Sequence, residues 1–268
     1  MTTVGRAMER GTRWSALLAL LAKHGRLTVA QAVEELGVSE ATVRRDFGEL
    51  AAQQLVTRTH GGVVGTAVAY NLPARYSSGA GDDAKERIAA AAADLAAEGS
   101  VVGFNGGTTT SATARRLAAR ADLARSTQRP AITVVTNALN IATEMVLRPF
   151  IRCVTLGGVA RPESYELSGP LAGMVLDELW LDTAFLGVDA LSSQVGAACR
   201  HEGEAGISAL MVQRADRVVV VATGDKVGRR AFARICPPAG VDLLVTDGSA
   251  PEDEVRALRA AGVTVEQV

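Results

Sequence analysis

Two adjacent arginines, Arg44 and Arg45, stand a short distance before a basic segment, Arg58 to Gly62, that reads Arg-Thr-His-Gly-Gly. An arginine presents its N–H donors in a planar fork that matches phosphate oxygens and the major-groove edge of guanine. Glycines at the end of a basic segment allow the backbone to turn tightly. These residue types at this spacing indicate contact with double-stranded DNA.

Helical periodicity separates a reading face from a core face around the two arginines. With Val43 at the centre of one face, Phe47 and Leu50 fall on the same side, and Arg45 falls nearly opposite. A helix of this kind can pack through its apolar side while it presents its arginines to DNA. The alternative is a solvated helix face whose arginines pair with Asp46, which is the usual situation of surface charge.

Three residues upstream predict how this helix is positioned. Thr28 can cap a short helix, Gly37 permits a tight turn, and Ser39 can cap the next helix by accepting a backbone N–H. A capped helix, a glycine turn and a second capped helix make a helix-turn-helix.

Beyond Ser100, short apolar runs alternate with helical stretches, which is typical of a mostly parallel α/β sheet covered on both faces. The predicted strands are VVGFN from Val101, AITVVT from Ala131, RCVTL from Arg152, AFLGV from Ala184, RVVVVA from Arg217, DLLVT from Asp242 and VTVEQ from Val263. Ligands of such sheets bind beyond the carboxyl ends of the strands, so we expect a binding site in the loops that follow them.

The loop after the first predicted strand, Asn105 to Thr110, leads directly into a predicted helix. Glycine N–H groups, threonine hydroxyls and a helix N-terminus together suit a phosphate, although the loop is neither a dinucleotide fingerprint nor a Walker motif. Lys226, one of three lysines in the chain, adds a compact charge. The alternatives are a plain strand-to-helix connection and a solvated loop lysine. The residues expected to bind an effector are Asn105, Gly106, Gly107, Thr108, Thr109, Thr110, Thr136, Asn137, Gly157, Gly158 and Lys226.

Charge is distributed almost evenly along the chain. The 28 basic and 29 acidic residues nearly cancel, and residues 1–64, with eight Arg or Lys and six Asp or Glu, carry only +2. Because phosphate neutralisation supplies much of the affinity for DNA, one such head would bind weakly at physiological salt. We therefore expect a homo-oligomer, a dimer or tetramer, with recognition helices about one DNA turn, roughly 34 Å, apart on a nearly symmetric operator.

Length and composition predict a DNA-binding head over residues 1–64, a linker over 65–83 rich in Gly, Ser, Pro and Asp, and an effector-sensing domain over 84–268. No apolar run approaches the roughly 20 residues that span a bilayer, and no signal peptide is recognisable, so we expect a cytoplasmic location. Cys153, Cys199 and Cys236 are far apart, which favours neither a disulfide framework nor a metal site. We expect no cofactor.

The run Thr42-Val43-Arg44-Arg45-Asp46-Phe47, together with the Arg-Thr-His-Gly-Gly segment, resembles the DeoR family of bacterial transcription regulators. Gly107-Thr108-Thr109, Thr136-Asn137, Leu156-Gly157-Gly158 and Gly169-Pro170 resemble that family's sensor domain. The resemblance implies a winged helix-turn-helix, a sensor similar in fold to ribose-5-phosphate isomerase, and a repressor released by a phosphorylated sugar-type effector. The residues then expected to contact or frame DNA are Thr28, Ser39, Glu40, Thr42, Arg44, Arg45, Arg58, Thr59, His60 and Gly61.

Three positions depart from the family pattern. Asn105 and Thr223 stand where the family usually has Asp, and Ser208 stands where a lysine is common. Exchanging Asp for Asn removes a charge and adds donors, so the pattern of sugar hydroxyls recognised there is expected to differ. A non-phosphorylated effector remains an alternative.

Two other functions are alternatives. A sugar-phosphate isomerase-like enzyme fused to a DNA-binding head would need a base within reach of the substrate, and neither Asn105 nor Thr223 is one at neutral pH. The remaining carboxylates for that role are Asp189, Glu202, Glu204 and Asp225. We expect no catalytic residue. A protein-interaction module that uses the winged helix for docking would show no salt-sensitive DNA binding.

Overall fold

The structure, a computed structural model, describes residues 10–24, 26–52, 56–59, 61–65 and 82–268. The chain divides into two compact units, Met1–Ala74 and Arg75–Val268, which are described separately. Most of the predicted linker, residues 65–83, lies outside the described residues, and its last two residues already belong to the helix α4 (Asp82–Asp94).

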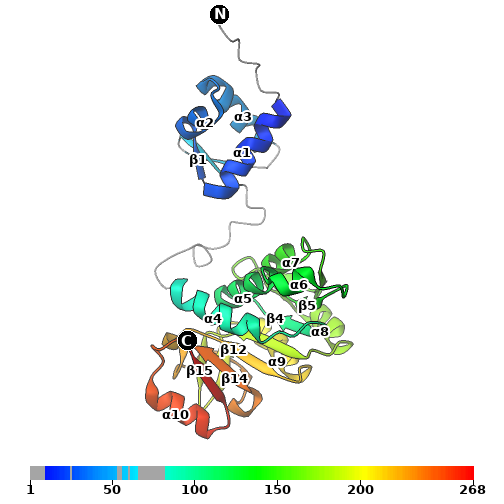
Figure 1. The fold of residues 1–268 in the computed structure, drawn as a ribbon. Coiled ribbons are helices and arrows are strands. Elements are labelled where there is room, and N and C mark those ends of the chain that lie inside the picture. The colour runs from blue at the N-terminus through cyan, green and yellow to red at the C-terminus, as the bar shows by residue number, and fades with distance from the viewer. Residues whose placement is uncertain (1–9, 25, 53–55, 60, 66–81) are drawn as a thin grey trace, which may run out of the picture. The chain divides into compact units, whose positions relative to one another are not determined.

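The first unit is a small helical domain with a three-stranded sheet (Figure 1). Its elements are α1 (Arg10–His24), β1 (Arg26–Thr28), α2 (Val29–Leu36), α3 (Glu40–Ala52), β2 (Val56–Thr59) and β3 (Gly62–Gly65). The strands pair antiparallel in the order β1-β3-β2, so β2 and β3 form a hairpin beside the helices. This is a winged helix-turn-helix, as predicted.

The predicted caps and turn are confirmed. The Oγ1 of Thr28 accepts the backbone N–H of Gln31, and the Oε1 of Gln31 accepts the backbone N–H of Thr28. This capping box begins α2. Gly37 ends α2 with a φ of 63°, the left-handed conformation that favours glycine. The Oγ of Ser39 accepts the backbone N–H of Thr42 at 3.2 Å and caps α3.

The second unit is built on a seven-stranded parallel sheet, and all seven predicted strands are present. In spatial order these strands are β15 (Thr264–Gln267), β14 (Leu243–Thr246), β12 (Val218–Val221), β9 (Thr183–Gly187), β4 (Val101–Phe104), β5 (Ile132–Thr136) and β6 (Ile151–Thr155). Because β12, β9 and β4 are adjacent and parallel, the loops that follow them gather at one edge of the sheet.

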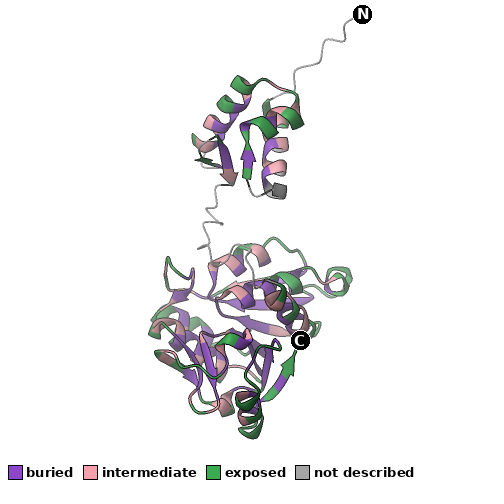
Figure 2. Cartoon of the chain, turned by 90° about the vertical axis from the view of Figure 1, so that its left-hand side faces the viewer, coloured by how far each residue is buried: buried purple, intermediate pink, exposed green. Residues whose placement is uncertain are grey.

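Helices cover both faces of this sheet. One face packs against α4, α5 (Thr108–Ala118), α6 (Ala121–Arg125) and α7 (Leu139–Met145), and the other against α8 (Pro170–Asp177), α9 (Glu202–Gln213) and α10 (Glu252–Ala260). Alternate residues of β12 serve the two cores: Val219 and Val221 join the first and Val218 and Val220 the second. The strands are accordingly mostly buried in Figure 2.

Two small antiparallel sheets, which the sequence did not predict, complete the unit. A hairpin of β7 (Val159–Ala160) and β8 (Leu167–Ser168) follows β6. The second sheet contains β10 (Ala190–Ser192), β11 (Gly196–Cys199) and β13 (Ala233–Cys236). Their strands are too short to produce a recognisable alternation in the sequence.

Among the described helices, none has the length and apolar character needed to cross a membrane. Within the same residues, no three His, Cys, Asp or Glu side chains are grouped to hold a metal ion. All three cysteines are free, and Cys199 and Cys236 are buried.

Candidate functional site

The helix α3 separates its two faces as predicted. Val43, Phe47 and Leu50 are at most 1% exposed and lie in the core of the first unit, whereas Arg44 and Arg45 are exposed. Figure 2 shows the exposed residues of this unit on its outer surface.

Both arginines of α3 have carboxylate neighbours one turn away. The Nη2 of Arg44 lies 2.5 Å from Glu40 Oε1, and the Nε of Arg45 lies 3.9 Å from Glu49 Oε1. Exposed pairs of this spacing contribute only about 0.3–0.5 kcal/mol, so DNA phosphates or bases can replace them. The side chain of Arg45, 82% exposed, is the more accessible of the two.

Asp46 does not pair with these arginines, so the alternative of a helix face paired with Asp46 is wrong. The residue is 2% exposed, and its carboxylate accepts hydrogen bonds from the Arg13 guanidinium and, at 3.1 Å, from the Trp14 indole N–H, both on α1. The hydrogen bond from Arg13 lowers the pKa of Asp46, with Trp14 acting in the same direction and burial opposing both. Asp46 therefore links α3 to α1, and the two arginines remain exposed.

The hairpin of β2 and β3 is the wing, and four of its residues were predicted to contact DNA. Arg58, Thr59 and Gly61 are exposed, and His60 lies outside the described residues. An Nη of Arg58 comes within 3.9 Å of where a Cβ on Gly48 would stand, so its side chain reaches toward α3. Gly62 cannot carry a side chain, because a Cβ there would lie 2.3 Å from the Leu27 carbonyl oxygen.

The remaining predicted DNA-contacting residues are Thr28, Ser39, Glu40 and Thr42. Thr28 and Ser39 cap helices, the Thr42 hydroxyl lies 2.8 Å from that of Ser39, and Glu40 pairs with Arg44. In the free protein these four side chains therefore stabilise the helix ends or hold an arginine.

A cavity of about 400 Å³ opens at the carboxyl ends of β4 and β9 in the second unit. Six of the residues predicted to bind an effector line it, namely Asn105, Gly106, Gly107, Thr108, Thr109 and Lys226. Its other lining residues are Arg161, Glu163, Ser164, Glu166, Gly187, Val188, Asp189, Cys199, Arg200, Glu204 and Ser208.

The glycine-threonine loop presents the N-terminus of α5 to this cavity. Gly107 precedes α5 with a φ of 136°, a conformation that side chains rarely adopt. The Oγ1 of Thr109 is buried and has no hydrogen-bond partner among the described residues. The N–H groups of the first helical turn and this hydroxyl are donors that suit an anion.

Lys226 reaches the same cavity from the short turn η2 (Gly224–Lys226) after β12. Its Nζ donates to the carbonyl oxygen of Val188 at 2.7 Å, which fixes the ammonium near the end of β9. Burial lowers the pKa of Lys226, while the carboxylates of Asp189 and Asp225 act in the opposite direction.

Two of the departures from the family pattern contact each other. Asn105 donates from Nδ2 to the Gly187 carbonyl at 2.9 Å and to the Ser208 hydroxyl at 3.1 Å, and its Oδ1 accepts the Gly187 N–H at 2.8 Å. Both amide hydrogens of Asn105 are thus used within the protein. The residue therefore ties the end of β4 to β9 and α9, and the expectation that it alters the pattern of sugar hydroxyls recognised there stays a prediction.

Five of the predicted effector-binding residues do not line the cavity. The Thr110 hydroxyl donates to the Gly107 carbonyl, and the Thr136 hydroxyl donates to the Phe104 carbonyl, so both stabilise the backbone. Gly157 packs against Leu171, and a Cβ on Gly158 would meet the Ser168 carbonyl oxygen at 2.4 Å. Asn137 lies behind the cavity, where its Nδ2 donates to Glu166 at 3.1 Å.

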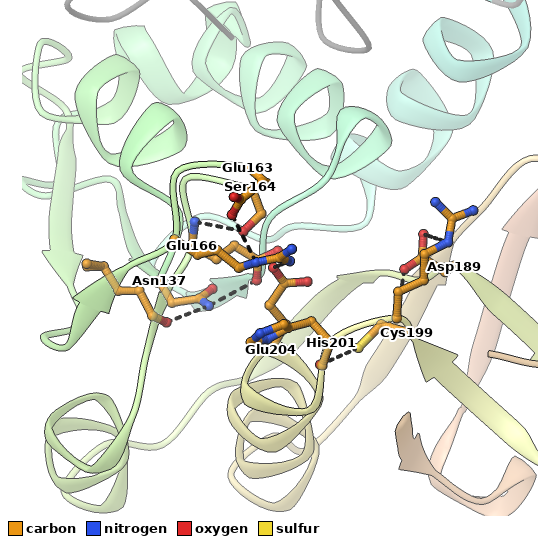
Figure 3. A network of polar contacts seen from close by, with 11 residues as sticks. Asn137, Glu163, Ser164, Glu166, Asp189, Cys199, His201 and Glu204 are labelled. Carbon is orange, nitrogen blue, oxygen red and sulfur yellow. Dashed lines mark hydrogen bonds and ion pairs between the residues drawn. The ribbon is translucent and has the colours of Figure 1, made fainter. Parts of the chain in front are cut away.

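The hairpin of β7 and β8 supplies cavity residues that the sequence did not reveal. The Nη1 of Arg161 lies 3.0 Å from Glu204 Oε1, and its Nε lies 3.2 Å from Glu163 Oε2. Figure 3 shows Glu163, Ser164 and Glu166 of this hairpin close to Asn137 and Glu204. The charged residues between Gly158 and Gly169 could have indicated a functional segment. Because no strand is recognisable there, the sequence did not predict that they lie beside the cavity.

Glu166 is the most deeply buried carboxyl group of the cavity, with 5% of the residue exposed. Burial and the nearby Glu204 raise its pKa to about 7, although hydrogen bonds from Asn137 and the Gly106 backbone lower it. Burial also raises the pKa of the Cys199 thiol to about 12, so this thiol is neutral and unreactive.

Both units match known families. Residues 13–66 match the DeoR-like helix-turn-helix domain, and residues 81–248 match the DeoR C terminal sensor domain. The HTH-type transcriptional regulator GlpR of Haloferax volcanii is 34% identical over 87% of this chain and 88% of its own length. The glycerol-3-phosphate regulon repressor of Escherichia coli is 27% identical over 94% of this chain and 96% of its own.

Another relative, the HTH-type transcriptional repressor GlcR of Bacillus subtilis, is 30% identical over 90% of this chain and 89% of its own length. Among solved structures, ribose 5-phosphate isomerase A from Methanocaldococcus jannaschii overlaps 54% of each chain at 20% identity, with a TM-score of 0.40. The named relatives are transcriptional regulators, which decides against the isomerase-like enzyme. With both of its units matched, the chain belongs to the DeoR family of DNA-binding transcriptional regulators.

Proposed function

We propose that this regulator represses genes for the use of a carbohydrate or related metabolite, and that a phosphorylated sugar-type effector in the cavity releases it from its operator. The observation that carries the proposal is the convergence of the glycine-threonine loop and Lys226 on one cavity. The names of the relatives, among them a glycerol-3-phosphate regulon repressor and a putative aga operon transcriptional repressor, support the metabolite class.

The phosphate would lie at the N-terminus of α5. Its oxygens would accept hydrogen bonds from backbone N–H groups after Gly107, from the hydroxyls of Thr108 and Thr109, and from Lys226. The Thr109 hydroxyl, which has no partner among the residues that the structure describes, supports this arrangement, because a buried donor without a partner is costly unless a ligand satisfies it. The hydroxyl groups of the effector would face the polar side chains of the hairpin.

An effector releases DNA only if it binds the two states of the protein with different affinity. The experiment is a titration of labelled DNA from the region beside the protein's own gene, followed by fluorescence anisotropy. We expect sequence-selective binding that glycerol 3-phosphate or glucose 6-phosphate weakens and that unphosphorylated glycerol or glucose leaves unchanged. Equal binding to unrelated DNA would contradict the regulator's proposed operator, and equal effects of both sugar classes would contradict the phosphate site.

The regulator is further proposed to act as a homo-oligomer. The small positive charge of the head supports this, since a single head would make few phosphate contacts. Light scattering of the free protein and of its operator complex measures the number of chains. A monomer in both states would contradict the proposal.

Replacing Arg45 by alanine is expected to weaken operator binding by roughly 1–3 kcal/mol and to relax base preference, because this exposed side chain faces away from the core. Arg58→Ala in the wing is expected to weaken binding to all sequences similarly and to lower the salt slope by about one. Competition among operator variants at several salt concentrations separates the two effects. An unchanged base preference in Arg45→Ala would show that another element reads the sequence.

A further inference from the structure

Glu166 occupies a special place in the cavity wall, next to the loop that would hold the effector's phosphate. It directly precedes β8 in the segment that connects β7 and β8, and its side chain passes so close to Gly106 that a Cβ there would lie 2.4 Å from Glu166 Cγ. Gly106 precedes Gly107, the N-cap residue of α5. The carboxyl group is therefore fixed beside the proposed phosphate position although it belongs to a different segment of the chain.

The partners of Glu166 are neutral donors. Asn137 Nδ2 donates to Oε2 at 3.1 Å, as Figure 3 shows, and the Gly106 backbone provides a further hydrogen bond. Within the part of the chain that the structure describes, no cationic group forms an ion pair with Glu166 within 4.0 Å. The three cavity cations have other partners: Arg161 pairs with Glu163 and Glu204, the Nε of Arg200 lies 4.0 Å from Asp189 Oδ1, and Lys226 donates to a backbone carbonyl.

Two carboxylates near Glu166 disfavour a negative charge on its side chain. Glu204 on α9 and Asp189 after β9 both oppose its ionisation, whereas the charge of Arg161, whose pKa Glu166 helps to raise, favours it. The cavity lining contains four carboxylates, Glu163, Glu166, Asp189 and Glu204, and three cations, Arg161, Arg200 and Lys226. A phosphate dianion would add two negative charges to this set, close to a buried carboxylate that forms no ion pair among the described residues.

We propose that Glu166 binds the effector as a neutral carboxylic acid: one proton is taken up from water when an anion enters the cavity, and the acid O–H donates to a ligand oxygen. The proposal rests on the proposed function, since it requires an anion at the glycine-threonine loop. Protonation removes the repulsion between two like charges and converts an acceptor into a donor. A pKa of about 7 in the free protein means that this proton is readily gained at neutral pH.

The sign of the pH dependence follows from this uptake. Below the pKa of free Glu166 the acid is already protonated, and affinity for an anion does not change with pH on its account. Above that pKa, each further unit of pH lowers the association constant of the anion about tenfold, until the pKa of Glu166 in the bound state is reached. Effector affinity is therefore highest in mildly acidic solution and falls from about pH 7 upward.

Calorimetry of the full chain between pH 6 and 9 tests this, in pairs of buffers with different ionisation enthalpies so that the protons exchanged are counted. Inorganic sulfate and glycerol 3-phosphate are the probes, because sulfate stays a dianion over this range and its proton count reports the protein alone. We expect the parent to take up close to one proton with sulfate at pH 8 and to lose affinity about tenfold from pH 7.5 to 8.5. Glu166→Gln, a neutral isostere, is expected to bind without this uptake and more tightly than the parent at pH 8.

Glu163→Gln is the matched control, because Glu163 lines the same cavity but its side chain is 64% exposed and pairs with Arg161. It is expected to keep the parent's proton count and slope. If Glu166→Gln kept them as well, another group, such as Lys226, would take up the proton and the proposal would be overturned. Proton-free binding by the parent would overturn it too while leaving the anion site intact. Failure of both probes to bind the parent would overturn the anion site itself and this proposal with it.

Discussion

Replacing Asp46 by alanine is expected to destabilise the DNA-binding head by about 3 kcal/mol and to abolish operator binding, while the sensor domain stays folded. The substitution removes a buried carboxylate to which the Arg13 guanidinium and the Trp14 indole donate. Charged hydrogen bonds of this kind contribute about 1.5–3 kcal/mol each, and breaking a buried ion pair costs more than forming it gains. The sensor has its own two hydrophobic cores and does not depend on this contact.

Trp14 provides the measurement. The chain has two tryptophans, so in a Trp180→Phe background the fluorescence of Trp14 reports on the head alone during denaturant unfolding. Glu49→Ala is the control: it lies on the same helix, and its partners Arg10 and Arg45 are exposed, so a loss well below 1 kcal/mol is expected. Equal losses in both variants would show that the Asp46 contact does not hold α3 in place.

The same contact gives the head a pH dependence. Because the folded state lowers the pKa of Asp46, its contribution is fully present above the unfolded value of about 3.9 and is lost as the pH falls through the folded value. Asp46→Ala should therefore flatten the acid limb of the head's stability curve.

Replacing Lys226 by alanine is expected to weaken effector binding by about one to two orders of magnitude and so to give a regulator that no longer responds to its effector. The ammonium lines the cavity and is held by the Val188 carbonyl, and each charge-assisted hydrogen bond lost is worth about 1.5–3 kcal/mol. Operator affinity without effector should stay within about twofold of the parent, because Arg44 and Arg45 are untouched. Calorimetry with glycerol 3-phosphate and anisotropy with operator DNA measure the two affinities.

Arg229→Ala is the matched control for Lys226. It removes a cation of the same sign three residues further along, from an exposed position outside the cavity lining, and should leave both affinities unchanged. Effector binding by Lys226→Ala as tight as that of the parent would mean that the anion lies elsewhere. A loss of DNA binding instead would assign the lysine to folding or to assembly.

Local features of the sequence determined the elements of both units. Some features depend only on residues within a few positions of one another, so they can be predicted without a structure. These are the caps at Thr28 and Ser39, the left-handed turn at Gly37 and the apolar face of α3. The five inner strands of the large sheet are mostly buried, largely apolar runs, and their order along the chain predicts that the loops after them meet at one edge. For this reason the sequence correctly predicted that Lys226 and the glycine-threonine loop lie at the same edge of the sheet, where both line the cavity.

Only the tertiary structure decided which side chains meet. Asp46 accepts a hydrogen bond from Arg13, 33 positions away, and Asn105 donates to Ser208, 103 positions away. No local sequence pattern predicts either contact. The β7–β8 hairpin has strands of two residues, which carry no periodicity, yet it places Arg161 and Glu166 in the cavity. Local capping and periodicity are properties of neighbouring residues, whereas the composition and charge of a cavity depend on the path of the whole chain.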